Sequence, residues 1–220
     1  MTGVAFLGQQ FLYDGLSKKE LYDVLSCFGA RIKKFSAGET VDIFTKSEER
    51  DRDIGILISG VLQISHCDSD GEMYFTRIYE GEGVFGESFF NVTGDDYYVV
   101  SAAADSEIAY TDFERISEFC GNVCSMHVRF TRNIYRIIAE QSSKDSVRLG
   151  FLSKKTLREK LLAYFTELSQ NEGSREFNIN ISLTELSKYL CVDRSAMMRE
   201  MKKMRDEGII LSKGPHITLL

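Results

Sequence analysis

The stretch "ISLTELSKYLCVDRSAMMREMKKMRDEGIILSKGPHITLL", Ile181 to Leu220, decides the fold of the C-terminal part of this chain. Ser182 followed three residues later by Glu185 predicts a capping box, and Asp193 can cap a second helix that continues to Gly208. About three residues join the two helices, as in a helix-turn-helix. A strand, a Gly-Pro turn and another strand follow, so the sequence predicts a winged helix-turn-helix.

The second helix of this motif has two different faces. Met197, Met201 and Met204 recur at +4 and +3, which is typical of a face that packs on the core. Arginine can bind guanine O6 and N7 together, methionine can contact a thymine methyl, and the five basic residues between 194 and 205 suit phosphates. The residues expected to contact DNA are Ser182, Thr184, Arg194, Ser195, Met198, Arg199 and Lys202.

The chain upstream of this motif changes from short strands to long helices. From about Ala30 to Tyr110, β-prone runs alternate with glycines, which predicts a β-barrel or sandwich, with a hairpin turn at Asp70-Gly71. A short helix capped by Ser17 and Glu20 is expected before these strands. The fold class predicted is therefore α+β.

A long helical segment follows the strands. Its apolar positions have the 3-4 spacing of a coiled-coil seam, which predicts a homodimer. The alternative is a single amphipathic helix that lies on its own barrel. The seam consists of Val123, Met126, Phe130, Ile134, Ile137 and Gln141.

Charge and composition narrow the class of protein. The chain of 220 residues has a net charge of −6, but there are 14 basic against 24 acidic residues up to Ser146, and 13 against 9 after it. An acidic N-terminal part and a basic C-terminal part suggest that the two parts have different partners. Five scattered cysteines argue against a secreted disulfide framework, and no membrane span or signal peptide is visible, so we expect a cytoplasmic protein without a membrane partner.

Together these segments resemble the Crp/Fnr family of bacterial transcription regulators. "ILISGVLQI" and "GEGVFGES" are similar to the barrel of that family, the segment from Met126 to Gln141 to its dimer helix, and "LTELSKYLCVDRSAMMREMKKMRDEGII" to its winged helix-turn-helix. The resemblance implies a jelly-roll, cyclic-nucleotide-binding-like antiparallel barrel in residues 1–118, a dimerisation helix in 119–149 and a DNA-binding domain in 150–220. It also implies a homodimer on a pseudo-palindromic operator of double-stranded DNA, with RNA polymerase as a candidate partner.

Two departures from the family pattern limit what the resemblance implies. Many members have a glutamate where this chain has Ser195, so the usual operator sequence of the family does not carry over. In members that bind cyclic nucleotides, Glu87 would match the glutamate that holds the ribose, but Asp96 or Tyr97 stands at the position of the phosphate-binding arginine. No Lys or Arg occurs from Ile78 to Glu114, so a cyclic nucleotide would lack its charge-assisted partner. Only Arg77, or Arg129, Arg132 and Arg136 on the long helix, could replace that arginine.

A different small-molecule effector remains open, and no cofactor is expected. Aromatic walls with a few polar groups would suit an apolar or aromatic metabolite, although these aromatics could instead only fill the barrel. The residues proposed for such a pocket are Glu87, Ser88, Tyr97, Tyr98, Ser142 and Ser143, with Phe89 and Phe90 as further aromatic surface.

Other functions find less support in the sequence. The N-terminal cysteine cluster of oxygen-sensing family members is absent, since only Cys27 precedes Cys67, while Cys120 and Cys124 could belong to a thiol sensor or be idle thiols. His66, His127 and His216 form no metal signature, and no catalytic motif is visible, so we expect no enzyme. A ligand-binding signalling subunit whose winged domain contacts protein instead of DNA is the alternative function.

Overall fold

The computed structural model describes residues 11–46, 53–90, 92–117, 124–179 and 181–220. It is an α+β fold that divides into two compact units, one that ends at Ser142 and one from Ser143 to Leu220. The long helix α3 (Ser125–Leu152) contributes to both units. The predicted limits at 118/119 and 149/150 stay a prediction. No helix within the described ranges is long and apolar enough to cross a membrane.

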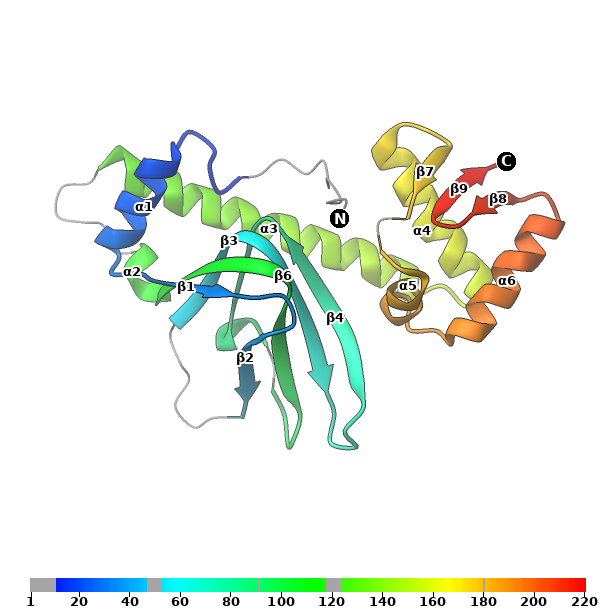
Figure 1. Ribbon diagram of the computed structural model, residues 1–220, viewed down its shortest axis with the longest axis horizontal. Helices are drawn as coiled ribbons and strands as arrows, with labels where there is room; N and C mark the ends of the chain where they lie inside the picture. Colours follow the sequence, from blue (N-terminus) through cyan, green and yellow to red (C-terminus); the bar gives the residue numbers. More distant parts are fainter. Residues whose placement is uncertain (1–10, 47–52, 91, 118–123, 180) are drawn as a thin grey trace. The chain divides into compact units, whose positions relative to one another are not determined.

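The first unit is built around one antiparallel sheet (Figure 1). Its long strands are β3 (Asp53–Cys67) and β6 (Tyr97–Asp112), which pair with each other. Each also pairs with two shorter strands at different points along its length. These are β1 (Arg31–Phe35) and β2 (Thr40–Thr45) on β6, and β4 (Met73–Glu80) and β5 (Gly83–Gly86) on β3.

The predicted jelly-roll barrel is not closed. The strand order is β1-β6-β3-β4, and among the described residues no pairing joins β1 to β4. The sheet bends instead at register shifts in β3 and β6, one of them beside Gly60. Gly60 has φ 101°, and a Cβ there would lie 2.3 Å from the Ser106 hydroxyl oxygen, so the bend requires a glycine.

The two faces of this sheet have separate cores because side chains alternate along a strand. Ile54, Ile56 and Ile58 of β3 pack against the helices, whereas Leu57 packs inside the sheet with Phe85. The core that contains Ile54, Ile56 and Ile58 also includes α1 (Lys18–Cys27). This helix begins with the expected capping box of Ser17 and Glu20. Two short helices follow strands of this sheet along the chain: η1 (Glu87–Phe89) comes after β5, and α2 (Phe113–Ser117) comes after β6.

The long helix α3 packs on its own unit through the residues that were assigned to a dimer seam. Phe130, Ile134 and Ile137 are 0%, 2% and 2% exposed and belong to the same core as α1 and β3. Side chains already buried in one chain cannot bury further area against a second copy. Their assignment to an intermolecular seam is therefore wrong, and the alternative of an amphipathic helix on its own sheet holds for them. Val123 lies outside the described residues.

The second unit contains the predicted winged helix-turn-helix. Its helices after α3 are α4 (Leu157–Glu172), α5 (Leu183–Tyr189) and α6 (Arg194–Asp206). The expected wing strands are confirmed as β8 (Ile210–Lys213) and β9 (His216–Leu219), and β7 (Glu176–Asn178), which the sequence did not predict, pairs with β9. Buried side chains from all three helices and from these strands form one core.

Candidate nucleic-acid interface and effector cavity

The start of each helix in the helix-turn-helix is fixed by a capping side chain. The Ser182 hydroxyl accepts from the Glu185 N–H at 3.1 Å, and the Glu185 carboxylate accepts from the Ser182 N–H at 2.8 Å. The Asp193 carboxylate accepts from the Ala196 N–H at 2.7 Å. Both predicted caps are confirmed, and they leave the first turns of α5 and α6 ordered for contact with a ligand.

Helix α6 presents the two faces that its sequence indicates. Met197, Met201 and Met204 are buried at 0%, 4% and 0% exposure. The opposite side is exposed and carries three cations with a serine and a methionine, and Ser182 and Thr184 are exposed at the start of α5. The residues on this side are Arg194, Ser195, Met198, Arg199 and Lys202, while Lys203, Arg205 and Asp206 are exposed toward the end of the helix. This is the composition expected of a helix that enters the major groove.

Two cationic side chains contact the turn between α5 and α6, and neither contact was predicted from the sequence. The Arg148 guanidinium donates to the Tyr189 carbonyl at 3.1 Å and lies 4.8 Å from the centre of the Tyr189 ring. The Lys160 ammonium donates to the Leu190 carbonyl at 3.4 Å. Cations at these carbonyls stabilise the end of α5, since the last carbonyls of a helix lack partners within it. Cys191 follows with φ 52°, the left-handed conformation of the turn.

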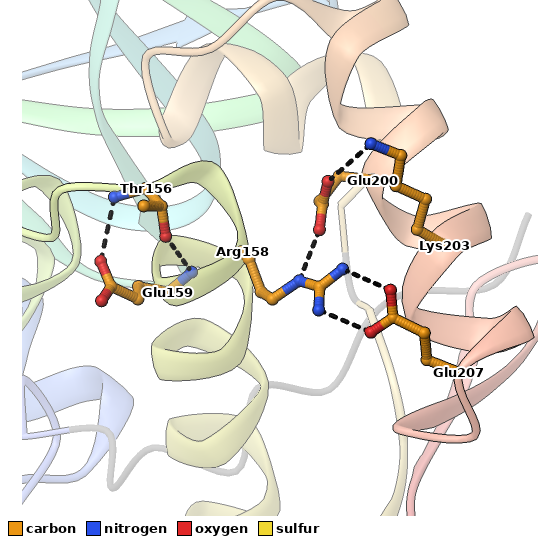
Figure 2. A network of polar contacts seen from close by, with 6 residues as sticks. All are labelled: Thr156, Arg158, Glu159, Glu200, Lys203 and Glu207. Atoms are coloured by element: carbon orange, nitrogen blue, oxygen red, sulfur yellow. Dashed lines mark hydrogen bonds and ion pairs between the residues drawn. The ribbon is translucent and has the colours of Figure 1, made fainter.

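Glu200, the acidic residue in the middle of α6, faces α4 and not the side that carries Arg194 and Arg199. Glu200 forms an ion pair with Arg158 of α4 at 2.6 Å, and the same guanidinium contacts Glu207 (Figure 2). This pairing joins residues 42 positions apart, so a pattern within α6 alone could not reveal it.

The residues proposed for an effector pocket occupy different surroundings. Glu87 and Ser88 belong to η1, and Ser142 and Ser143 are exposed on α3 in different units. Tyr98 stacks on Phe90 at 4.6 Å and lies 4.8 Å from the His66 ring. Tyr97 is its neighbour on β6 and so points to the other side of the strand. The part played by these residues in effector binding stays a prediction.

A cavity of about 180 Å³ lies in the first unit, and none of those six residues lines it. Lys33 lies 5.3 Å above the Tyr110 ring, and Arg31 pairs with Asp53. Burial raises the pKa of Tyr110, with a further contribution from Asp42, so its hydroxyl stays protonated as a hydrogen-bond donor. The lining therefore offers both signs of charge and an aromatic wall. Its residues are Arg31, Lys33, Val41, Asp42, Phe44, Asp53, Gly55, Gly86 and Tyr110.

The position of the missing arginine is occupied by an acidic contact. Asp96 lies 3.1 Å from His66 Nε2. Three of the four arginines that could replace the missing one have other contacts. Arg77 donates to the Tyr79 hydroxyl at 2.7 Å, Arg129 donates to the Gly15 carbonyl at 3.0 Å and Arg136 pairs with Asp14. The fourth, Arg132, is exposed on α3. The exclusion of a cyclic nucleotide as effector stays a prediction.

The cysteines and histidines were considered as candidate metal ligands and thiol sensors. The described residues contain no cluster of three or more metal-ligating side chains. Cys124 Sγ lies 3.0 Å from His127 Nδ1 at the start of α3, and Cys120 lies outside the described residues. A redox role for this pair of cysteines stays untested.

Comparison with known proteins agrees with this geometry. Residues 159–220 match the model of the Crp-like helix-turn-helix domain. The chain is 23% identical over 211 residues to the fumarate and nitrate reduction regulatory protein of Vibrio cholerae, covering 93% of this chain and 80% of that protein. It is also 23% identical to the regulatory protein HlyX of Actinobacillus pleuropneumoniae, over 80% of this chain and 73% of that one.

Solved structures share the fold at lower sequence identity. CprK in complex with OCPA has a TM-score of 0.71 at 14% identity and covers 91% of this chain and 88% of its own. The c-di-GMP responsive regulator CLP of Xanthomonas campestris has a TM-score of 0.64 at 15% identity, over 92% and 99% of the two chains. The first two relatives are named as regulatory proteins, and CLP is described as a global regulator that links cell-cell signalling to virulence gene expression. Residues 159–220 therefore carry a Crp-like helix-turn-helix domain, and the chain as a whole is similar to DNA-binding regulators of the Crp/Fnr type.

Proposed function

We propose that this regulator acts as a homodimer on a pseudo-palindromic operator and changes its affinity for DNA when a small molecule that is not a cyclic nucleotide binds to its first unit. The observation that carries the proposal is the exposed face of α6, where Arg194, Arg199 and Lys202 are presented by a helix whose opposite face is buried. Chromosomal DNA as the partner also requires a cytoplasmic location.

Selection of bound duplexes from a random pool tests this activity. Recovery of sequences with two inverted half-sites, and an affinity that falls steeply with salt, would support it, because neutralised phosphates release counterions. The alternative, a winged domain that contacts protein, predicts no enrichment of any sequence and no binding to duplex DNA at physiological salt.

The homodimer is proposed to form through a face of α3 different from the one that the sequence suggested. Val128 and Tyr135 are 50% and 58% exposed, and Arg132, Ala139 and Ser142 between and after them are exposed too. These five positions are spaced 4, 3, 4 and 3, which is the seam of a two-stranded coiled coil. Small side chains at Ala139 and Ser142 allow two helices to approach closely. The seam shifts by two residues from Met126–Gln141 because the original positions serve the core of the chain itself.

Substitution of Tyr135 by glutamate tests this face. Two charges brought together across a symmetric helix pair would oppose association, whereas a half-exposed position costs little in the protomer. We expect monomers in analytical ultracentrifugation and weakened operator binding, since one half-site offers half the contacts. A variant that sediments as the wild-type dimer would remove this face from the proposal.

The effector is proposed to bind in the cavity beneath β1 and β2. The mixed charges of Lys33 and Asp42 and the Tyr110 hydroxyl suit a small polar or zwitterionic molecule with an apolar part that packs on Phe44. Native mass spectrometry of the protein purified from its own host would identify a retained ligand. Tyr110→Phe should weaken its retention, while Tyr74→Phe, at an exposed tyrosine that does not line the cavity, serves as the matched control.

RNA polymerase is proposed as a further partner of the DNA-bound dimer, because a transcription regulator must change how polymerase engages a promoter. Co-precipitation of polymerase with the dimer on operator duplex, compared with scrambled duplex, tests this step.

A further inference from the structure

Arg158 joins the first turn of α4 to Glu200 in the recognition helix α6 and to Glu207, the C-cap residue of that helix (Figure 2). Its own backbone is fixed by the capping box of α4, in which the Thr156 hydroxyl accepts from the Glu159 N–H at 3.2 Å and the Glu159 carboxylate accepts from the Thr156 N–H at 3.0 Å. Arg158 lies between Thr156 and Glu159, so the capping box fixes the backbone that carries its side chain.

All three guanidinium nitrogens of Arg158 are used in these contacts. Nη1 and Nη2 donate to the two carboxylate oxygens of Glu207 at 2.6 and 3.0 Å, and Nε donates to Glu200 Oε1 at 2.6 Å. The second oxygen of Glu200 lies 4.0 Å from the Lys203 ammonium. Bidentate pairs of this kind fix direction as well as distance, which a single ammonium group cannot do.

The spacing of the two glutamates makes this contact sensitive to the rotation of α6. Glu200 and Glu207 are seven residues apart, about two helical turns, and so lie on one side of the helix. The buried side of α6 consists of Met197, Met201 and Met204. Methionine side chains adapt to their surroundings and specify position poorly. The rotation of α6 about its axis is therefore constrained more by the three guanidinium contacts of Arg158, here called the arginine fork, than by the core.

The same contact keeps the negative charge of α6 away from DNA. At about 100° per residue, Glu200 lies roughly 140° around the helix from Ser195 and 160° from Lys202. Its carboxylate is 18% exposed and faces α4, whereas Arg199 and Lys202 face solvent. Without Arg158, Glu200 and Glu207 would be free to turn outward beside the phosphates.

We propose that Arg158 is a positioning residue for DNA recognition: it fixes the rotation of α6 through Glu200 and Glu207, so that the exposed arginines meet base edges in register. This inference rests on the proposed binding of DNA by α6. Arg158 itself touches no base in the proposal. Its loss is therefore expected to reduce discrimination between sequences more than affinity for DNA in general.

The experiment measures binding of the full-length protein to its selected operator duplex and to a scrambled duplex at several salt concentrations. Arg158→Lys keeps the charge but cannot form the fork. We expect a loss of about tenfold in operator affinity, in the range that charge-assisted hydrogen bonds contribute, with scrambled binding and the salt slope unchanged. Lys155→Ala removes an exposed charge near the same helix start and is the matched control; it should not change the ratio of the two affinities.

A thermodynamic cycle separates positioning from a general loss of stability. Because Arg158 acts through the two glutamates, adding E200Q and E207Q to R158K should lower the operator-to-scrambled ratio no further than R158K alone. An R158K protein with the wild-type ratio and a native circular dichroism spectrum would overturn the inference. If R158K does not fold, E207Q alone, at a half-exposed position, should still lower the ratio, and an unchanged ratio there would equally overturn it. Failure of the wild type to bind any duplex would instead refute the proposed function.

Discussion

Phe130→Ala distinguishes a core residue from an interface residue, because the two assignments predict different measurements. Phe130 is 0% exposed, lies 5.5 Å from the Phe28 ring and belongs to the core of α1 and β3. Truncation of a buried phenylalanine costs about 3 to 5 kcal/mol. For a unit of this size each kcal/mol lowers the melting temperature by roughly 2 to 4 °C, so the shift expected is about 6 to 20 °C.

The assay is urea unfolding followed by circular dichroism, since the chain has no tryptophan, together with sedimentation of the folded variant. Phe130→Ala should lower the urea midpoint and leave the dimer intact, whereas Tyr135→Glu should leave the unfolding of the protomer nearly unchanged and abolish the dimer. The reasoning is refuted if Phe130→Ala keeps the wild-type midpoint but sediments as a monomer, because the phenylalanine would then lie between chains.

Four further outcomes are expected. Arg199→Ala should cost roughly 1 to 3 kcal/mol of binding free energy on the operator and relax the preference at particular base pairs. Lys202→Ala should weaken binding to operator and scrambled duplex alike and reduce the salt slope by about one unit. Equal losses of affinity for Arg199→Ala on both duplexes would refute base contacts by this residue. Asp193→Ala should destabilise the second unit by about 1 kcal/mol in urea unfolding, whereas no change would mean that the cap contributes nothing. Cyclic AMP at millimolar concentration should give no calorimetric binding signal, and a micromolar dissociation constant would show that an arginine has taken over the phosphate. Burial and the hydrogen bond to Glu107 raise the pKa of Tyr22 to about 12, so its contribution to stability is complete below pH 10 and lost as the pH rises from 10 to 12; Tyr22→Phe should flatten that part of the pH profile of the urea midpoint.

The sequence predicted the second unit well because its signals are local. The capping pairs Ser182–Glu185 and Thr156–Glu159 each join residues three positions apart, and only the first was identified in advance. The methionine face of α6 follows from helical spacing within 13 residues. Strand β7 was missed because it has three residues, too few to show a period of two, and it depends on pairing with β9 nearly 40 residues later.

The first unit was predicted less completely because its decisive features depend on distant pairings. A spacing of 3 and 4 says that a helix buries one side, but it does not say whether the cover is a second copy or the strands of the same chain. Phe130 and Ile134 are covered by the same chain, because they pack in one core with Ile54 and Ile56, about 75 residues upstream. Likewise, the cavity brings together Arg31, Phe44, Gly86 and Tyr110 from four strands, and no local pattern connects them.

The recognition helix shows how these two kinds of information combine. Its exposed basic face can be read from the sequence, but that face only describes a helix that is able to bind DNA. Whether Arg199 meets the intended base depends on the rotation of α6, and a side supported by three flexible methionines leaves that rotation loosely defined. Arg158, 42 residues before Glu200, supplies the missing constraint through contacts with Glu200 and with Glu207 at the C-cap of the helix. Under the proposed function, affinity for DNA follows from the local composition of α6, whereas sequence discrimination depends on a contact made by the tertiary fold.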